Sequence, residues 1–240
     1  MAVFRLGDAP VFPPVDWAEP DGLLAAGGDL SAPRLLRAYA QGIFPWYEEG
    51  CPILWWAPDP RLVLYPREFH LGKTMRRLLR QGVFHVTADT DFPAVIAACA
   101  GIRGPHREGT WITPEMMDAY IALHREGYAH SIECWQDGVL AGGLYGVSLG
   151  AAFFGESMFS NADNASKTAM ACLAALMLDW GFHFIDCQLP TNHLRRFGAR
   201  EVPRAVYLRK LAAALGHPTR LAPWRIPPGL DPVDAFGRRA

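Results

Sequence analysis

Residues 129–155 read AHSIECWQDGVLAGGLYGVSLGAAFFG and decide the fold class. Three apolar runs in this stretch have the length of strands, and two short sequences, Gln136-Asp137-Gly138 and Ser148-Leu149-Gly150, separate them. Glycine beside polar residues between apolar runs is typical of tight turns. We therefore predict a meander of three strands over residues 129–135, 139–147 and 151–155.

Strands and helices alternate on both sides of this meander. A helix begins at Thr113-Pro114 and stops near Gly127, and Asn164 can cap a second helix that runs to about Trp180. Periodicity predicts further strands at 61–65, 84–87 and 182–188, and further helices at 71–80 and 205–215. This mixture indicates an α+β fold in which helices flank a mixed β-sheet.

The first 59 residues differ from the rest in composition. Prolines gather there, and because proline removes a backbone donor they favour loops and short elements. One helix is predicted, with Ser31 as its cap, Leu35, Leu36 and Tyr39 on one face, and Gly42 at its end. We expect a small N-terminal domain over residues 1–59 and a larger domain over 60–240 that includes a C-terminal tail.

Composition excludes several classes of protein. The 240 residues carry 23 Lys and Arg against 24 Asp and Glu, so the net charge of −1 excludes binding to nucleic acid by bulk charge but not by a local patch. An aromatic content of 12% excludes a mainly disordered chain. The N-terminus lacks the apolar core of a signal peptide, and no apolar segment reaches membrane-spanning length. We expect a soluble cytoplasmic protein without a membrane partner.

The five cysteines are widely spaced and contain no C-x-x-C pair. This pattern fits neither a disulfide framework nor a four-cysteine zinc site. The histidines show no metal-ligand spacing either. We therefore expect reduced thiols, no metal and no cofactor.

The segment Phe184-Ile185-Asp186-Cys187-Gln188 is the first candidate for chemistry. Because side chains alternate along a strand, Asp186 and Gln188 are predicted to share a face, with Cys187 on the other. An acid beside an amide at a strand end can orient a reacting group. The alternative is that Asp186 caps a turn and Gln188 is a surface polar residue.

Glu156 is the second candidate, because it follows an apolar strand and adjoins Gly155, where backbone can approach a ligand closely. The alternative is a charge that ends a strand. A cysteine nucleophile at Cys187 is disfavoured, because that side chain is predicted to face away from Asp186.

A basic stripe lies on the helix predicted at 71–80. Four cations at i, i+3, i+4 and i+7 share one face, and such a face can hold phosphates or can simply be solvated. These residues are Lys73, Arg76, Arg77 and Arg80. A second basic group, Arg195, Arg196, Arg200 and Arg204, could extend the patch.

Several aromatic side chains are candidates for a pocket wall or for stacking on a base, with ordinary core packing as the alternative. They are Trp46, Trp56, Trp111, Tyr120 and Phe153.

Several short motifs follow one another in a fixed order along the chain. They include GIFPW at 42–46, LWWAPDPR at 54–61, GTWIT at 109–113, HSIE at 130–133, GGLYGV at 142–147, GESMFS at 155–160, ASKT at 165–168 and IDCQ at 185–188. In this combination the chain closely resembles the bacterial leucyl/phenylalanyl-tRNA–protein transferases, from about residue 20 to about residue 200.

The resemblance implies an aminoacyltransferase. Such an enzyme moves Leu, Phe or less often Met from aminoacyl-tRNA to the N-terminal α-amine of a protein that begins with Lys or Arg. The product is marked for N-end-rule degradation. The resemblance also implies that the larger domain is similar to the GNAT acyltransferases.

Site residues carry over position by position. Asp186 and Gln188 match the catalytic pair, and Glu156 matches the active-site carboxylate. Trp111 matches a contact near the terminal adenosine of the tRNA, with Tyr120 on the helix beside it, and the basic stripe would contact the tRNA backbone. The donor side-chain pocket would be formed by Trp46, Leu144, Phe153, Met158, Leu173 and Ile185, of which Leu144 and Leu173 replace a Met and an aromatic residue found in several members.

The proposed chemistry suits an activated ester as donor. The acceptor α-amine has a reference pKa of about 7.7–8.0, so the reaction needs positioning of the amine more than a strong base. We expect the amide oxygen of Gln188 to orient the amine and Asp186 to polarise Gln188. Three alternatives remain: a GNAT-type N-acyltransferase that uses acyl-CoA, a non-catalytic tRNA-binding adaptor, and a peptidase built on Cys187.

Overall fold

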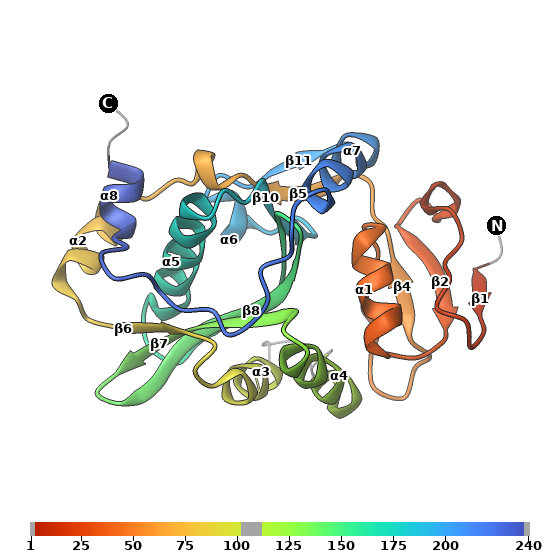
Figure 1. Ribbon diagram of the computed structural model, residues 1–240, viewed down its shortest axis with the longest axis horizontal. Helices are drawn as coiled ribbons and strands as arrows, with labels where there is room; N and C mark the ends of the chain where they lie inside the picture. The colour runs from red at the N-terminus through yellow and green to blue at the C-terminus, as the bar shows by residue number, and fades with distance from the viewer. Residues whose placement is uncertain (1–2, 102–111, 238–240) are drawn as a thin grey trace.

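A computed structural model gives the structure of residues 3–101 and 112–237, which form two β-sheets and the helices around them (Figure 1). The larger sheet has seven strands in the order β11-β5-β10-β9-β8-β7-β6. Its strands are β5 (Arg61–Leu64), β6 (His85–Ala88), β7 (Ala129–Gln136), β8 (Val139–Leu149), β9 (Ala152–Ser160), β10 (Phe184–Gln188) and β11 (Arg200–Val202).

The predicted meander is the centre of this sheet. β7 pairs antiparallel with β8, and β8 pairs antiparallel with β9. The turn between β7 and β8 works because Asp137 and Gly138 both adopt positive φ, at 51° and 78°, which suits a two-residue hairpin loop. β10 then returns beside β9 as its parallel neighbour, through the crossover helix α5 (Ala165–Asp179).

Two apolar clusters pack on opposite faces of the larger sheet. Neighbouring residues alternate between them: Phe153 lies in the cluster beneath α5, and Phe154 lies in the cluster on the other face. Figure 1 shows α5 on one face and α3 and α4 on the other. The flanking helices are α2 (Lys73–Gln81), α3 (Phe92–Ala100), α4 (Pro114–Arg125), α6 (Asn192–Arg195), α7 (Arg204–Leu215) and α8 (Pro232–Gly237).

The N-terminal part forms a separate four-stranded sheet of short strands in the order β1-β2-β4-β3. These strands are β1 (Phe4–Leu6), β2 (Leu23–Gly27), β3 (Phe44–Pro45) and β4 (Leu54–Trp56), and α1 (Ala32–Ala40) lies between the small sheet and the rest of the molecule (Figure 1). Tyr39 and Phe44 belong to the same apolar cluster as Phe154. The division after residue 59 therefore stays a prediction, because apolar packing is continuous across it.

The structure confirms the mixture of helices and strands and differs in its details. β9 continues to Ser160, so Glu156 lies within a strand and not after one. Helix α3 was not predicted, because its sequence is apolar on every side and shows little periodicity. Asn164 precedes α5 as expected, but it has φ of 69° and its side chain does not cap the helix. Within residues 3–101 and 112–237, no helix is long and apolar enough to cross a membrane.

Candidate active site

A pocket of about 460 Å³ opens where β9 and β10 part. The two parallel strands pair only from Ala152 to Phe154 and from Phe184 to Asp186, whereas β9 stays paired with β8 as far as Ser160. The space between the diverging strands is therefore left to side chains. Glu156 and Met158 line it from β9, and Gln188 lines it from the end of β10.

All six residues expected to form the donor side-chain pocket line this cavity. Phe153 and Ile185 are fully buried at its base, and Trp46 reaches it from the loop after β3. The indole of Trp46 is held against Trp56, with ring centroids 5.5 Å apart, and the Trp56 Nε1 donates to the Trp46 carbonyl at 2.7 Å. The full set is Trp46, Leu144, Phe153, Met158, Leu173 and Ile185.

A glycine makes room for one wall. A Cβ on Gly146 would lie 2.1 Å from the Phe154 carbonyl oxygen and 2.6 Å from the Phe153 ring, closer than any Cβ contact allows. Gly146 on β8 thus permits the Phe153 ring to cross the sheet surface and form the pocket floor.

Glu156 owes its position to a β-bulge. Tyr145 pairs with Ser157 and Gly146 pairs with Gly155, so Glu156 is the extra residue between two ladder positions. Its carboxylate accepts hydrogen bonds from the Tyr39 hydroxyl at 2.8 Å and the Tyr120 hydroxyl at 3.0 Å. These two hydroxyls also lie in hydrogen-bond contact with each other.

The surroundings raise the pKa of Glu156 to about 7. Removal of the carboxylate from water is the main cause, and the nearby charge of Asp186 adds to it, while the bonds from Tyr39, Tyr120 and Gln188 act in the opposite direction. Glu156 nevertheless keeps partial exposure on the pocket wall. A carboxyl group with this pKa exchanges protons near neutral pH.

Gln188 stands at a second bulge. Asp186 pairs with Val63 and Gln188 pairs with Leu62, so Cys187 is the extra residue, and Gln188 itself has φ of 54°. The Gln188 side-chain Nε2 donates to Glu156 Oε1 at 3.0 Å. Among the described residues nothing donates a hydrogen bond to the Gln188 amide oxygen, which leaves that acceptor for a ligand in the pocket.

Asp186 lies behind the pocket and does not line it. Its carboxylate forms a two-pronged pair with Arg61, at 2.8 Å from Nε and 2.7 Å from Nη2, and accepts from the Tyr207 hydroxyl at 2.7 Å. All three side chains are buried. Asp186 Oδ1 also accepts from the backbone N–H of Gln188 at 3.0 Å.

The shared face expected for Asp186 and Gln188 rests on strict alternation along β10 and stays a prediction. The bulge at Cys187 and the positive φ of Gln188 break strict alternation. Asp186 does not contact the Gln188 amide and instead holds the backbone that carries it. Glu156 is the side chain that contacts the amide.

Other expected residues are placed as follows. Tyr120 is fully buried behind Glu156 and does not line the cavity. Trp111 lies outside the described residues. Cys187 does line the pocket, but burial raises the pKa of its thiol well above the usual range, which disfavours the thiolate that a nucleophile needs.

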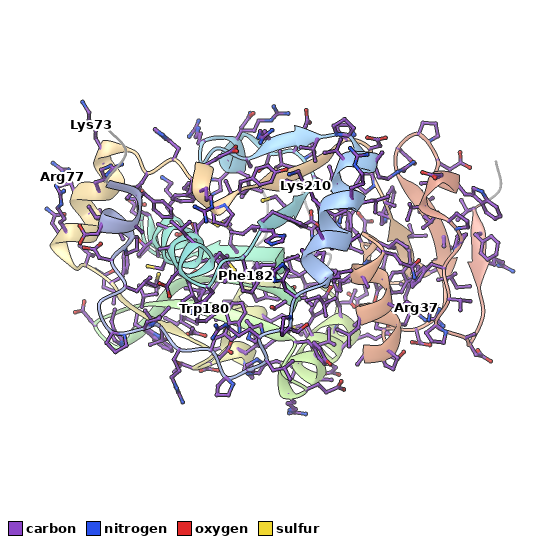
Figure 2. All side chains as sticks on the ribbon, turned by 45° about the horizontal axis from the view of Figure 1, so that its top comes forward. Arg37, Lys73, Arg77, Trp180, Phe182 and Lys210 are labelled. Carbon is purple, nitrogen blue, oxygen red and sulfur yellow. The ribbon has the colours of Figure 1, made fainter. Side chains whose placement is uncertain are left out.

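The basic stripe on α2 is divided between two roles. Lys73, Arg77 and Arg80 are exposed, and Figure 2 shows Lys73 and Arg77 projecting from one end of the molecule. Arg76 instead donates to the carbonyls of Leu71 at 3.0 Å and Phe236 at 2.9 Å, which attaches α8 to α2. Arg76 is thus committed to the fold.

The second basic group is mostly neutralised. Arg195 pairs with Glu201, Arg200 pairs with Glu68, and Arg204 approaches Asp16. Within the described part of the chain, Arg196 is the member of this group that has no ion pair.

Sequence reasoning missed Arg61, Tyr207 and the role of Tyr39. Tyr39 follows the apolar spacing of α1 and so looked like core. Arg61 ends the motif LWWAPDPR, but its partner stands 125 positions later, so no local pattern connects the two. The rings of Phe44 and Tyr207 cover the Arg61 guanidinium at 4.7 and 4.8 Å.

Comparison with known families identifies the family of the chain. A family model described as "Leucyl/phenylalanyl-tRNA protein transferase" matches residues 63–212, and one described as "Leucyl/phenylalanyl-tRNA protein transferase N-terminal domain" matches residues 28–59. The chain belongs to this family. The transferase is accordingly an aminoacyltransferase.

Curated relatives agree over nearly the whole length. A protein of Anaeromyxobacter sp. (strain Fw109-5) named leucyl/phenylalanyl-tRNA–protein transferase is 55% identical, covering 98% of this transferase and 100% of that protein. Proteins with the same name from Azotobacter vinelandii (58% identity; 83% and 89% covered) and Myxococcus xanthus (51%; 97% and 100%) are similar. Among solved structures, L-PGS from Bacillus licheniformis matches 70% of this transferase and 54% of that chain at 8% identity, with a TM-score of 0.38 that is too low to bear on the fold.

Proposed function

We propose that this enzyme transfers Leu, Phe and, less efficiently, Met from aminoacyl-tRNA to the N-terminal α-amine of proteins that begin with Lys or Arg. The product would be marked for N-end-rule degradation in the cytoplasm. The observation that carries the proposal is an apolar pocket lined also by a carboxylate of raised pKa and by an amide whose oxygen accepts no hydrogen bond from the described residues.

The pocket fits the donor side chain. Its walls are aromatic, leucine, isoleucine and methionine side chains, so a Leu, Phe or Met side chain is buried without loss of hydrogen bonds. A side chain branched at Cβ would place bulk next to the ester. Ile and Val are expected to be rejected by shape.

The reaction needs positioning more than a strong base. The α-amine nitrogen attacks the ester carbonyl carbon, the bond to the ribose oxygen of the tRNA breaks, and the proton lost by the amine ends on that ribose oxygen. The Gln188 amide oxygen accepts a hydrogen bond from the attacking amine, because Glu156 holds the other end of the amide. Asp186 and Arg61 keep the Gln188 backbone in place.

Charge explains the preference for a cationic acceptor. Arg61 neutralises Asp186 behind the wall, so Glu156 is the carboxylate that faces the cavity. A Lys or Arg side chain near the mouth would favour the ionised form of Glu156.

Two further features of the fold and surface support the proposal. Parallel strands that diverge to admit a ligand agree with a GNAT-like acyltransferase domain, with the aminoacyl ester in place of acyl-CoA. The exposed cations Lys73, Arg77 and Arg80 offer contacts for the tRNA backbone.

The deciding experiment measures transfer of labelled Leu from leucyl-tRNA to a protein that begins with Arg. A protein that begins with Asp and a leucyl-CoA donor serve as controls. We expect transfer only with tRNA and the Arg-start protein. Transfer from the thioester alone would favour acyl-CoA chemistry. Salt-sensitive tRNA binding without transfer from either donor would favour a non-catalytic adaptor.

A further inference from the structure

One edge of the donor pocket carries a histidine, although most of its lining is apolar. α6 contributes His193 to the lining, and α5 contributes Met170 and Leu173. Lys167 lies three residues before Met170 in the same helix, so it stands one turn nearer the N-terminal end of α5 on the face that lines the pocket. Two elements from different parts of the chain thus place His193 in the lining and Lys167 one helical turn from it.

The imidazole of His193 lines the pocket and has a hydrogen-bonding nitrogen without a partner among the described residues. It packs edge-on against Phe197, with ring centroids 5.1 Å apart, and its shielded Nε2 has no hydrogen-bond partner in the described part of the chain. A polar ring in a pocket wall that no protein group fixes carries an unmet hydrogen-bonding requirement.

Two cations act on this ring. Arg196 is the C-terminal cap of α6, three residues after His193, and burial together with the charges of Lys167 and Arg196 lowers the pKa of the imidazole. The Lys167 ammonium donates to Asn164 Oδ1 at 2.9 Å. Neither cation has an ion pair within residues 3–101 and 112–237, although Asp163 precedes α5. Glu156, the carboxylate in the pocket lining, already accepts three hydrogen bonds.

We propose that Lys167, His193 and Arg196 form a phosphate-binding site for the phosphodiester directly 5′ of the terminal adenosine of the donor tRNA. Cations that have no ion pair in the described part of the chain, close to an apolar cavity, fit an anion attached to the group inside it. The inference rests on the proposed function, since it assigns the donor's first phosphate. The site holds that phosphate while the side chain occupies the pocket, and so positions the ester beside Gln188.

The test compares two inhibitors that differ only in this phosphate. Both are amide-linked phenylalanyl adenosines, one with and one without a 5′-phosphate, and each competes with phenylalanyl-tRNA in the transfer assay. For the wild type we expect the phosphate to lower Ki about tenfold, which corresponds to one charge-assisted, partly solvated contact. The double variant Lys167→Gln/Arg196→Gln should bring the ratio of the two Ki values close to one and leave Ki of the unphosphorylated compound unchanged.

Lys210→Gln is the matched control, because Lys210 is an exposed cation on α7 outside the pocket lining (Figure 2). It should keep the wild-type ratio. A wild-type ratio of one, or a ratio that the double variant leaves intact, overturns the phosphate site. Failure of the wild type to transfer phenylalanine from tRNA at all would instead refute the proposed function.

Discussion

Gln188 Nε2 donates to Glu156 Oε1 at 3.0 Å, and this bond fixes which end of the amide faces the pocket. If the amide were reversed, its oxygen would point at a carboxylate and its NH₂ group would face the amine, so two donors would oppose each other. Glu156 therefore controls the orientation of the Gln188 amide, and we expect the rate of transfer to depend on whether Glu156 is ionised.

Transfer should depend on pH through Glu156. The ionised carboxylate is the better acceptor for the Gln188 amide, and its pKa is raised to about 7. We expect kcat to rise with pH through about 7 at saturating substrates, in the direction of deprotonation. Glu156→Gln should abolish this inflection and lower kcat. An unchanged inflection in that variant would assign the titration to another group.

Glu156→Gln should also stabilise the protein at alkaline pH. Because the folded-state pKa lies above the unfolded value of about 4.3, the folded state binds more protons between these limits, and the free energy of unfolding falls as pH rises through this window. A neutral Gln avoids that loss, so the variant should gain about 1 to 3 kcal/mol over the wild type at pH 8 and little at pH 4. Urea unfolding at both pH values measures the difference.

Removal of the Gln188 amide should reduce the rate without loss of donor binding. Gln188→Ala leaves the apolar walls intact, so we expect kcat to fall about a hundredfold while KM for aminoacyl-tRNA changes little. Single-turnover transfer from phenylalanyl-tRNA measures the chemical step. A kcat equal to that of the wild type would remove Gln188 from the mechanism.

The Arg61–Asp186 pair should show strong coupling. Arg61→Met leaves a buried carboxylate without its cation and should cost about 3 to 5 kcal/mol of stability. The double variant Arg61→Met/Asp186→Asn should recover much of this loss, because the uncompensated charge is gone. Denaturant unfolding of the wild type, the two single variants and the double variant completes the double-mutant cycle. Additive losses of stability in the double variant would contradict a direct interaction.

Leu173→Phe should shift the choice of donor. Leu173 is buried in the pocket wall, and a larger ring there reduces the space for the donor side chain. We expect kcat/KM for phenylalanyl-tRNA to fall by about tenfold relative to leucyl-tRNA. Competition between the two donors in one reaction gives the ratio directly, with Leu178→Phe, outside this pocket, as the control.

The sequence by itself determined the strand meander and most of the helices, and its resemblance to a known family indicated which residues would form the pocket wall. Apolar periodicity and turn residues are local signals, and Leu144, Phe153 and Ile185 line one cavity because their strands are neighbours. The motif order also indicated the family. Local signals were sufficient wherever a residue's role depends on its own strand or helix.

Only the tertiary structure decided which polar groups meet. Bulges at Glu156 and Cys187 each add one residue to a ladder and interrupt strict alternation, and a single strand does not reveal them. One partner of each site carboxylate, Tyr39 for Glu156 and Arg61 for Asp186, stands more than 100 positions away in the chain. Buried polar groups are paired by whichever donors the packing of distant elements brings within reach, so the pairing follows from the complete fold and not from sequence spacing.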